Sequence, residues 1–171
     1  MKKILLLFTA ILSIHSFCFA EDIYVGDNDG MTIYLRTESI RSNSNVTPGI
    51  ANMVTTITYK TLEIPNEKKL EEVKILCLDN GITHRERDYR VSFSYDRVKK
   101  EYVDQIIAIY IDKSMWLEKS KKYTYDQHIS NNKVCYLHSD DPQNAIYVNT
   151  FKEVSKYYND HPEIRKVTYS D

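Results

Sequence analysis

Apolar and polar residues alternate along most of the chain from residue 22 to residue 95, which is the pattern of half-buried β-strands. The alternation predicts a β-hairpin over 22–36, with a tight turn at Gly26–Gly30 because Gly, Asn and Asp tolerate positive φ. Further strands are predicted over 53–60, 71–78, 82–95 and 105–111. The last of these is nearly all apolar, so we expect it to be a central strand.

The segments between these strands are predicted to be short and polar. Residues 37–40 suggest one helical turn, 41–49 a loop, and Asp79-Asn80-Gly81 a hairpin turn. In the strand 82–95, Tyr89, Val91, Phe93 and Tyr95 share one face. Arg85 and Arg87 continue that face outward.

Two helices are predicted after residue 124. The first covers 125–137, and the second covers 144–159 and ends before His161-Pro162. Tyr147, Phe151, Val154 and Tyr158 recur at helical spacing in the second helix. The predicted fold class is therefore α+β: an antiparallel β-meander of about six strands, with one or two C-terminal helices packed on one face.

The first twenty residues have the layout of a secretory signal peptide. Lys2 and Lys3 precede an apolar run over 4–19, and Ala20 is followed by Glu21, so we expect cleavage after Ala20. The protein is then periplasmic or secreted. Attachment to the outer membrane through a lipid on Cys18 is the less favoured alternative, because residues 15–17 do not match a lipid-attachment signal.

Composition narrows the class of protein further. Charged residues make up 27% and hydrophobic residues 42% of the 171 residues, which is ordinary for a single globular domain. Lys and Arg total 23 against 24 Asp and Glu, which excludes a strongly basic nucleic-acid binder. No stretch beyond the signal reaches the length of a transmembrane segment, about 18 apolar residues.

Removal of the signal peptide leaves two of the three cysteines, Cys77 and Cys135. Two cysteines in an oxidising compartment predict one disulfide bond. Two buried free thiols are the alternative.

Residues that carry chemistry are not arranged for catalysis or metal binding. His84, His128, His138 and His161 lack a second ligand at metal-binding spacing, so we expect no metal site and no cofactor. Asp27 and Asp29 resemble the start of a calcium loop, but Met31 stands at the next ligand position, which favours a hairpin turn. Nucleophile and phosphate-binding motifs are missing from the sequence, which favours a protein that is not an enzyme.

Two features favour binding. Lys121, Lys122, Tyr123 and Tyr125 form a basic and aromatic segment that suits an acidic glycan or an anionic membrane, although a solvated loop is the favoured explanation. The chain also holds 14 tyrosines, which suit protein interfaces as well as half-buried sheet.

The order of several short segments resembles the surface-adhesin protein E family of small exported bacterial proteins. The segments carrying the resemblance are Val25-Gly26, Tyr34, Thr37-Glu38-Ser39-Ile40, Arg41-Ser42-Asn43, Tyr59-Lys60, Cys77, Trp116 and Cys135. The resemblance covers about residues 22–137. It implies a six-stranded antiparallel sheet with a packed helix, a disulfide between Cys77 and Cys135, and adhesion to host extracellular-matrix and plasma proteins.

The domain organisation expected from these features is a signal peptide over 1–20, an adhesin-E-like domain over 21–137 and a C-terminal helical extension over 138–171. The expected function is an exported, non-enzymatic envelope or secreted binding protein that contacts a protein partner. A periplasmic immunity or inhibitor protein, or a small periplasmic enzyme, is the alternative.

Overall fold

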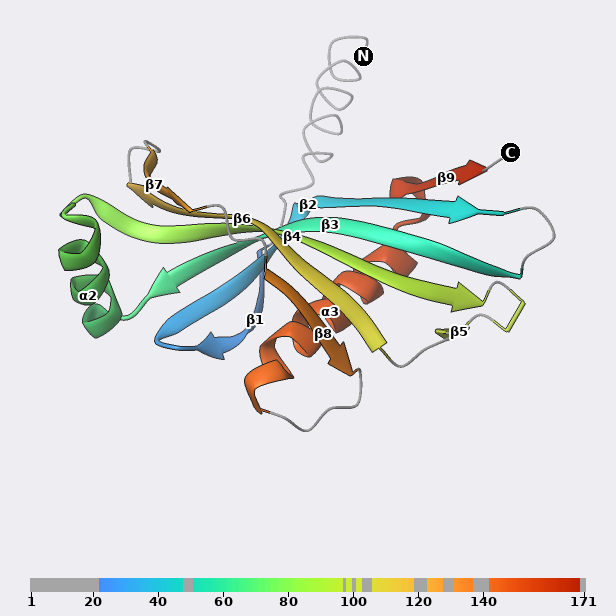
Figure 1. Cartoon of the computed structure of the whole chain (residues 1–171), viewed down its shortest axis with the longest axis horizontal. Coiled ribbons are helices and arrows are strands. Elements are labelled where there is room, and N and C mark those ends of the chain that lie inside the picture. Colours follow the sequence, from blue (N-terminus) through green and yellow to red (C-terminus); the bar gives the residue numbers. More distant parts are fainter. Residues whose placement is uncertain are drawn as a thin grey trace, which may run out of the picture.

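The described part of the chain forms one twisted sheet of nine strands with two α-helices (Figure 1). The computed structural model describes residues 22–47, 51–96, 98–99, 101–102, 106–118, 123–127, 131–136 and 142–169. The strands are β1 (Asp22–Asn28), β2 (Met31–Val46), β3 (Asn52–Pro65), β4 (Ile82–Asp96), β5 (Glu101–Tyr102), β6 (Ile106–Glu118), β7 (Tyr123–Gln127), β8 (Asn131–Tyr136) and β9 (Arg165–Tyr169). The expected signal peptide, with Cys18, lies outside the described residues.

Six strands lie in the order β1-β2-β3-β4-β6-β7, and each neighbouring pair is antiparallel. Of the other three, β5 pairs with β4, β8 extends along β6, and β9 lies parallel to β2. The helices are α2 (Glu67–Cys77) and α3 (Pro142–Asp160). This arrangement confirms the predicted α+β class, with an antiparallel sheet and a C-terminal helix.

The first hairpin forms as predicted. Asn28 pairs with Met31, so Asp29 and Gly30 are the two turn residues, with φ of 48° and 75°. Two consecutive positive φ values define the type I′ turn, whose twist matches that of the flanking strands.

β2 is longer than the sequence pattern indicates, because residues 37–46 continue the strand. The predicted helical turn over 37–40 and loop over 41–49 are therefore wrong. The pairing with β3 shifts between Arg36 and Arg41, and the Ser39 hydroxyl fills this irregularity by donating to the Arg36 carbonyl at 2.6 Å and accepting from the Lys60 amide at 2.7 Å. Small hydroxyl side chains beyond the shift are buried and pair across the strands, as Ser44 and Thr55 do at 2.9 Å.

Residues 71–77 belong to α2 and Leu78 caps its C-terminal end, so the predicted strand over 71–78 is wrong. The Asn66 side chain caps the helix by accepting from the Lys69 amide at 2.9 Å. Leu70, Val73 and Cys77 pack toward the core at helical spacing. Asp79–Gly81 consequently joins a helix to β4 and is not a hairpin turn.

The predicted helix over 125–137 is also wrong, because β7 and β8 occupy that region. Both strands pair with β6, through Trp116 with Tyr125 and through Ile107 with Cys135. Unpaired backbone groups along the long apolar strand β6 favour this outcome over an isolated helix.

α3 confirms the predicted helix over 144–159 and covers one face of the sheet, which we call the inner face (Figure 1). Phe151 and Val154 are fully buried there, and the Phe151 ring packs edge-on against Phe93, with ring centroids 5.4 Å apart. Since α3 supplies core residues and β9 joins the sheet, residues 142–169 are built into the same body as the strands.

The expected Cys77–Cys135 disulfide is not formed, and both cysteines are free thiols. Cys77 ends α2, just before β4 begins at Ile82, while Cys135 pairs with Ile107 near the other end of β4. Ile82 pairs with Glu118 and Ser92 with Ala108, so the two ends are separated by ten residues of β4, about 33 Å. A disulfide needs α-carbons within about 7 Å, so this fold excludes the bridge.

Candidate functional site

A row of charged and aromatic side chains crosses the inner face of the sheet on the α2 side of α3. The strand register places Glu63 of β3 opposite Arg85 of β4, and Arg85 opposite Trp116 of β6. Thr61, Arg87 and Ser114 form the next row, followed by the cross-strand pair Tyr59 and Tyr89. Alternation in β3 and β4 thus aims all these side chains at the same face.

Glu63 has a fully buried side chain, and Arg85 neutralises it. The Arg85 Nε lies 2.7 Å from Glu63 Oε2, and the Thr61 hydroxyl donates to Oε1 at 3.2 Å. The Arg85 guanidinium also lies over the Trp116 ring, 4.9 Å from its centroid. Arg85 is therefore the cation that makes the shortest contacts with the Glu63 carboxylate.

Arg87 is a second cation in this region, and its contacts with other described residues are long. Its nitrogens lie 3.4 Å from Ser114 Oγ, 3.5 Å from the Tyr89 hydroxyl and 3.6 Å from Glu63 Oε1. The Arg87 side chain is only 17% exposed. Two guanidinium groups therefore share one carboxylate, and the short contacts belong to Arg85.

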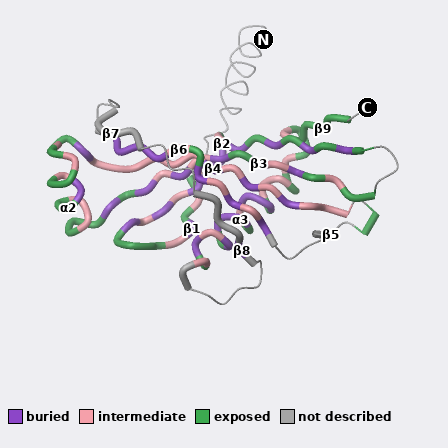
Figure 2. The backbone as a smooth tube through the Cα atoms, in the orientation of Figure 1, coloured by how far each residue is buried: buried purple, intermediate pink, exposed green. Residues whose placement is uncertain are grey.

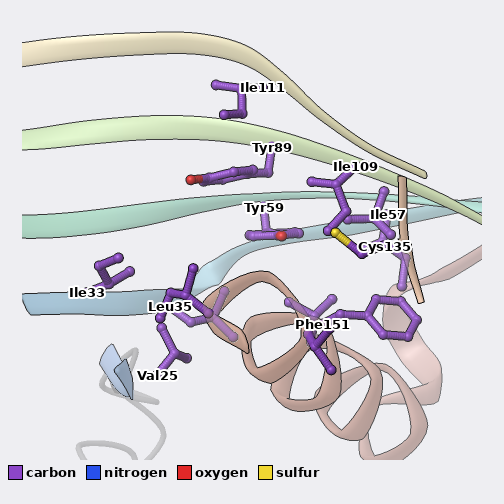
Figure 3. Packing of buried hydrophobic residues seen from close by; sticks show 14 of the residues in the cluster. Val25, Ile33, Leu35, Ile57, Tyr59, Tyr89, Ile109, Ile111, Cys135 and Phe151 are labelled. Atoms are coloured by element: carbon purple, nitrogen blue, oxygen red, sulfur yellow. The ribbon is translucent and has the colours of Figure 1, made fainter. Parts of the chain in front are cut away.

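Tyr59 and Tyr89 are stacked on neighbouring strands above α3 (Figure 3), with ring centroids 5.2 Å apart. Burial is the main cause that raises the pKa of both phenols, so both hydroxyls stay protonated at neutral pH. The Tyr89 hydroxyl reaches Glu63 at 3.5 Å. The Tyr59 hydroxyl is buried and has no hydrogen-bond partner among the described residues.

A small hollow opens between this part of the sheet and α3. Its lining residues come from strands β1, β2, β3 and β4 and from α3: Asn28, Ile33, Tyr59, Thr61, Arg87, Tyr89, Ile146, Tyr147 and Thr150. The free space inside is about that of one water molecule. The hollow can therefore take one oxygen-sized group of a ligand but not a whole substrate.

The C-terminal end of α2 carries a second unusual feature. Ile75, Leu76 and Leu78, which we call the α2 tip, are 71%, 81% and 93% exposed. The helix stands at one extremity of the sheet, so the tip faces away from the core (Figure 2). Three exposed large apolar residues within four positions exceed the scattered single ones that are normal for a surface.

Leu78 is also held in an uncommon backbone conformation. Its φ of 53° and ψ of 37° are left-handed, and its amide and that of Asp79 close the helix on the Ile75 and Lys74 carbonyls. Glycine normally occupies this position because a side chain is strained there. A leucine that is both strained and exposed contributes nothing to the fold that a glycine would not supply.

The structure does not bring the predicted binding residues together as a described site. Lys121 and Lys122 lie outside the described residues, and Tyr123 and Tyr125 belong to β7, which pairs with β6 through Leu117 and Trp116. Asp27 accepts a hydrogen bond from Tyr24, and Asp29 forms an ion pair with Lys69 at 2.8 Å.

Sequence reasoning missed the Glu63–Arg85 pair and misjudged the environment of Arg87. The alternation of residues correctly put Arg85 and Arg87 on the same face as Tyr89. It did not predict that their side chains are largely buried. The sequence does contain one signal for the pair. Glu63 lies on the buried face of β3, and a buried carboxylate requires a cation as its partner. Its partner strand cannot be read from the sequence.

Within the described ranges, no group of three or more His, Cys, Asp or Glu side chains is arranged to hold a metal ion. In the same part of the chain, neither helix is long and apolar enough to cross a membrane. None of the protein-family models, curated proteins and solved structures compared with this chain matches it.

Proposed function

We propose that this chain is an exported, non-enzymatic binding protein that docks a protein partner through the α2 tip. The observation that carries the proposal is the exposure of Ile75, Leu76 and Leu78 together, with Leu78 in a strained conformation. Strained backbone conformations of this kind cluster at functional sites in proteins. Burial of the tip in a partner accounts for both the strain and the exposure.

The surroundings of the tip specify the partner's chemistry. Lys74 and Glu71 neutralise each other at 3.2 Å on the preceding turn of α2. The tip is thus an apolar projection beside a compensated pair of charges and next to the Asp79 carboxylate, which accepts from the Gly81 amide at 2.8 Å, and it fits an apolar groove. The small size of the inner hollow supports a binding role over an enzyme that encloses its substrate.

Adhesion to a host protein, as the resemblance to surface-adhesin protein E implies, is one form of this function. Inhibition of a secreted toxin or enzyme is the other form. Both require an exported protein and a protein partner, and they differ in which molecule the tip meets.

Site-specific photo-crosslinking tests the proposal. A photoreactive residue at position 76 should yield one discrete adduct in the intact cells or medium in which the protein resides. A photoreactive residue at position 167, on exposed β9, is the matched control and should not yield that adduct. Equal adducts at both positions, or none at position 76, would refute docking through the tip.

A further inference from the structure

We propose that the hollow between the sheet and α3 is a binding site for a carboxylate group, held by Arg87 and Tyr59. The inference does not depend on docking through the α2 tip, which is formed by other residues.

Charge is the first reason. Glu63 is the carboxylate of this row, and its Oε2 is taken by Arg85 at 2.7 Å. Arg87 is left with contacts of 3.4 to 3.6 Å to described neighbours, although a guanidinium has five N–H donors in a rigid fork. That fork matches the two oxygens of a carboxylate better than any acceptor now beside it.

The Tyr59 hydroxyl is the second and independent reason. Tyr59 is 2% exposed, lines the same hollow and has an unpartnered hydroxyl within the described part of the chain. An unsatisfied buried hydroxyl is costly, so such groups are normally paired with an acceptor. A carboxylate oxygen in the hollow would accept from Tyr59 and from Arg87 together.

The remaining lining residues favour an anion over a cation or a neutral donor. The Thr61 hydroxyl donates to Glu63, and the Thr150 hydroxyl donates to the Ile146 carbonyl at 2.7 Å. The Tyr89 hydroxyl also contacts Glu63, so the other polar lining groups are Arg87, the Tyr59 hydroxyl, Tyr147 and the rim residue Asn28, and the cation among them is Arg87. The rim includes the exposed residue Asn28, and Arg87 is 17% exposed, so solvent reaches the guanidinium.

The size of the hollow limits the ligand to a small acid or to the end of a larger one. Space for about one water molecule admits one carboxylate oxygen, while the second oxygen and the rest of the ligand stay at the open rim. The source is either a free small carboxylic acid or a carboxylate carried by a peptide.

The test follows the Nε–H signal of Arg87 by nuclear magnetic resonance during titration of the purified chain. We expect sodium acetate, or a short alanine peptide with a free C-terminus, to shift that signal to saturation. Acetate alone would identify a free acid, and the peptide alone a peptide carboxylate. Acetamide and the amidated peptide are the uncharged controls. Equal shifts with chloride or acetamide, or no saturable shift with either acid, would overturn the proposal and leave the hollow as a water site.

Variants separate binding from folding. Tyr59→Phe removes the orphan hydroxyl, so it should raise the melting temperature of the free protein and weaken acid binding by about tenfold. Arg87→Gln should abolish binding, whereas Arg90→Gln should not, because Arg90 pairs with Asp112 at 3.1 Å on the opposite face. Unchanged affinity in Tyr59→Phe would contradict the assignment even if Arg87→Gln failed to fold.

Discussion

Arg85 donates from its Nε to the Oε2 of Glu63 at 2.7 Å, across β3 and β4, at a point where the Glu63 side chain has no exposed surface. A buried carboxylate is tolerated only with such a partner. The pair therefore ties the register of β3 to that of β4 at the end of the sheet near α2.

Replacing Glu63 by Gln should lower the free energy of unfolding by about 3–5 kcal/mol, because Arg85 and Arg87 would lose their shared carboxylate. Urea denaturation measures this loss. Asp112→Asn, which breaks the exposed pair with Arg90, is the control and should cost at most about 1 kcal/mol. Equal small losses in both variants would show that the buried pair does not anchor the sheet.

Gly26 cannot carry a side chain without strain. Its φ is 143°, and an added Cβ would lie 2.9 Å from Ile146 Cδ1 on α3. Gly26→Ala should therefore cost about 1–3 kcal/mol, measured by thermal or urea unfolding. Shortening the neighbour with Ile146→Val should relieve only the contact and not the backbone strain. Wild-type stability in Gly26→Ala alone would contradict this geometry.

The two thiols should remain free in the native protein. Cys77 is partly exposed and should react with a thiol reagent in the native state, although burial raises the pKa of its thiol and slows the reaction at neutral pH. Cys135 is buried and should react only after unfolding. Intact mass under non-reducing conditions checks this directly. A mass lower than that of the reduced chain by two hydrogens would show that the disulfide forms and would contradict this fold.

Stability should fall as the solution is made mildly acidic. Burial lowers the pKa of His84 in the folded protein, and its Nδ1 lies 2.9 Å from the Thr83 hydroxyl. A histidine whose folded pKa is lowered stabilises the fold above its unfolded value of about 6.5, and this stabilisation is lost as pH falls below that value. His84→Gln should flatten the pH dependence of the melting temperature between pH 7 and 5. An unchanged pH dependence in His84→Gln would exclude His84 as the source.

The parts of the fold that the sequence predicts are those set by local pattern. Phe151 and Val154 recur at helical spacing with no competing alternation, and α3 forms as expected. In α2 the two periods compete, since Val73, Ile75 and Cys77 alternate like a strand while Leu70, Val73 and Cys77 repeat like a helix. The Asn66 cap after Pro65 decides in favour of the helix.

The candidate sites depend on contacts between distant parts of the chain and so escape a local reading. Glu63 meets Arg85 only because of the β3–β4 register, and Tyr59 lines the hollow only because α3 packs back over this face of the sheet, against β1 and β2. The α2 tip could not be predicted from the sequence for a different reason. Ile75 and Leu76 have the composition of core residues, and only the position of the helix leaves them exposed.

The affinity of Leu78→Gly for the partner captured at position 76 tests the central claim most directly. Glycine removes the left-handed strain, so the variant should be up to about 1 kcal/mol more stable than the wild-type protein. Loss of the exposed side chain should nevertheless weaken partner binding at least about tenfold. A more stable protein with weaker binding is the predicted result. Unchanged affinity in the stabilised variant would contradict docking through the α2 tip.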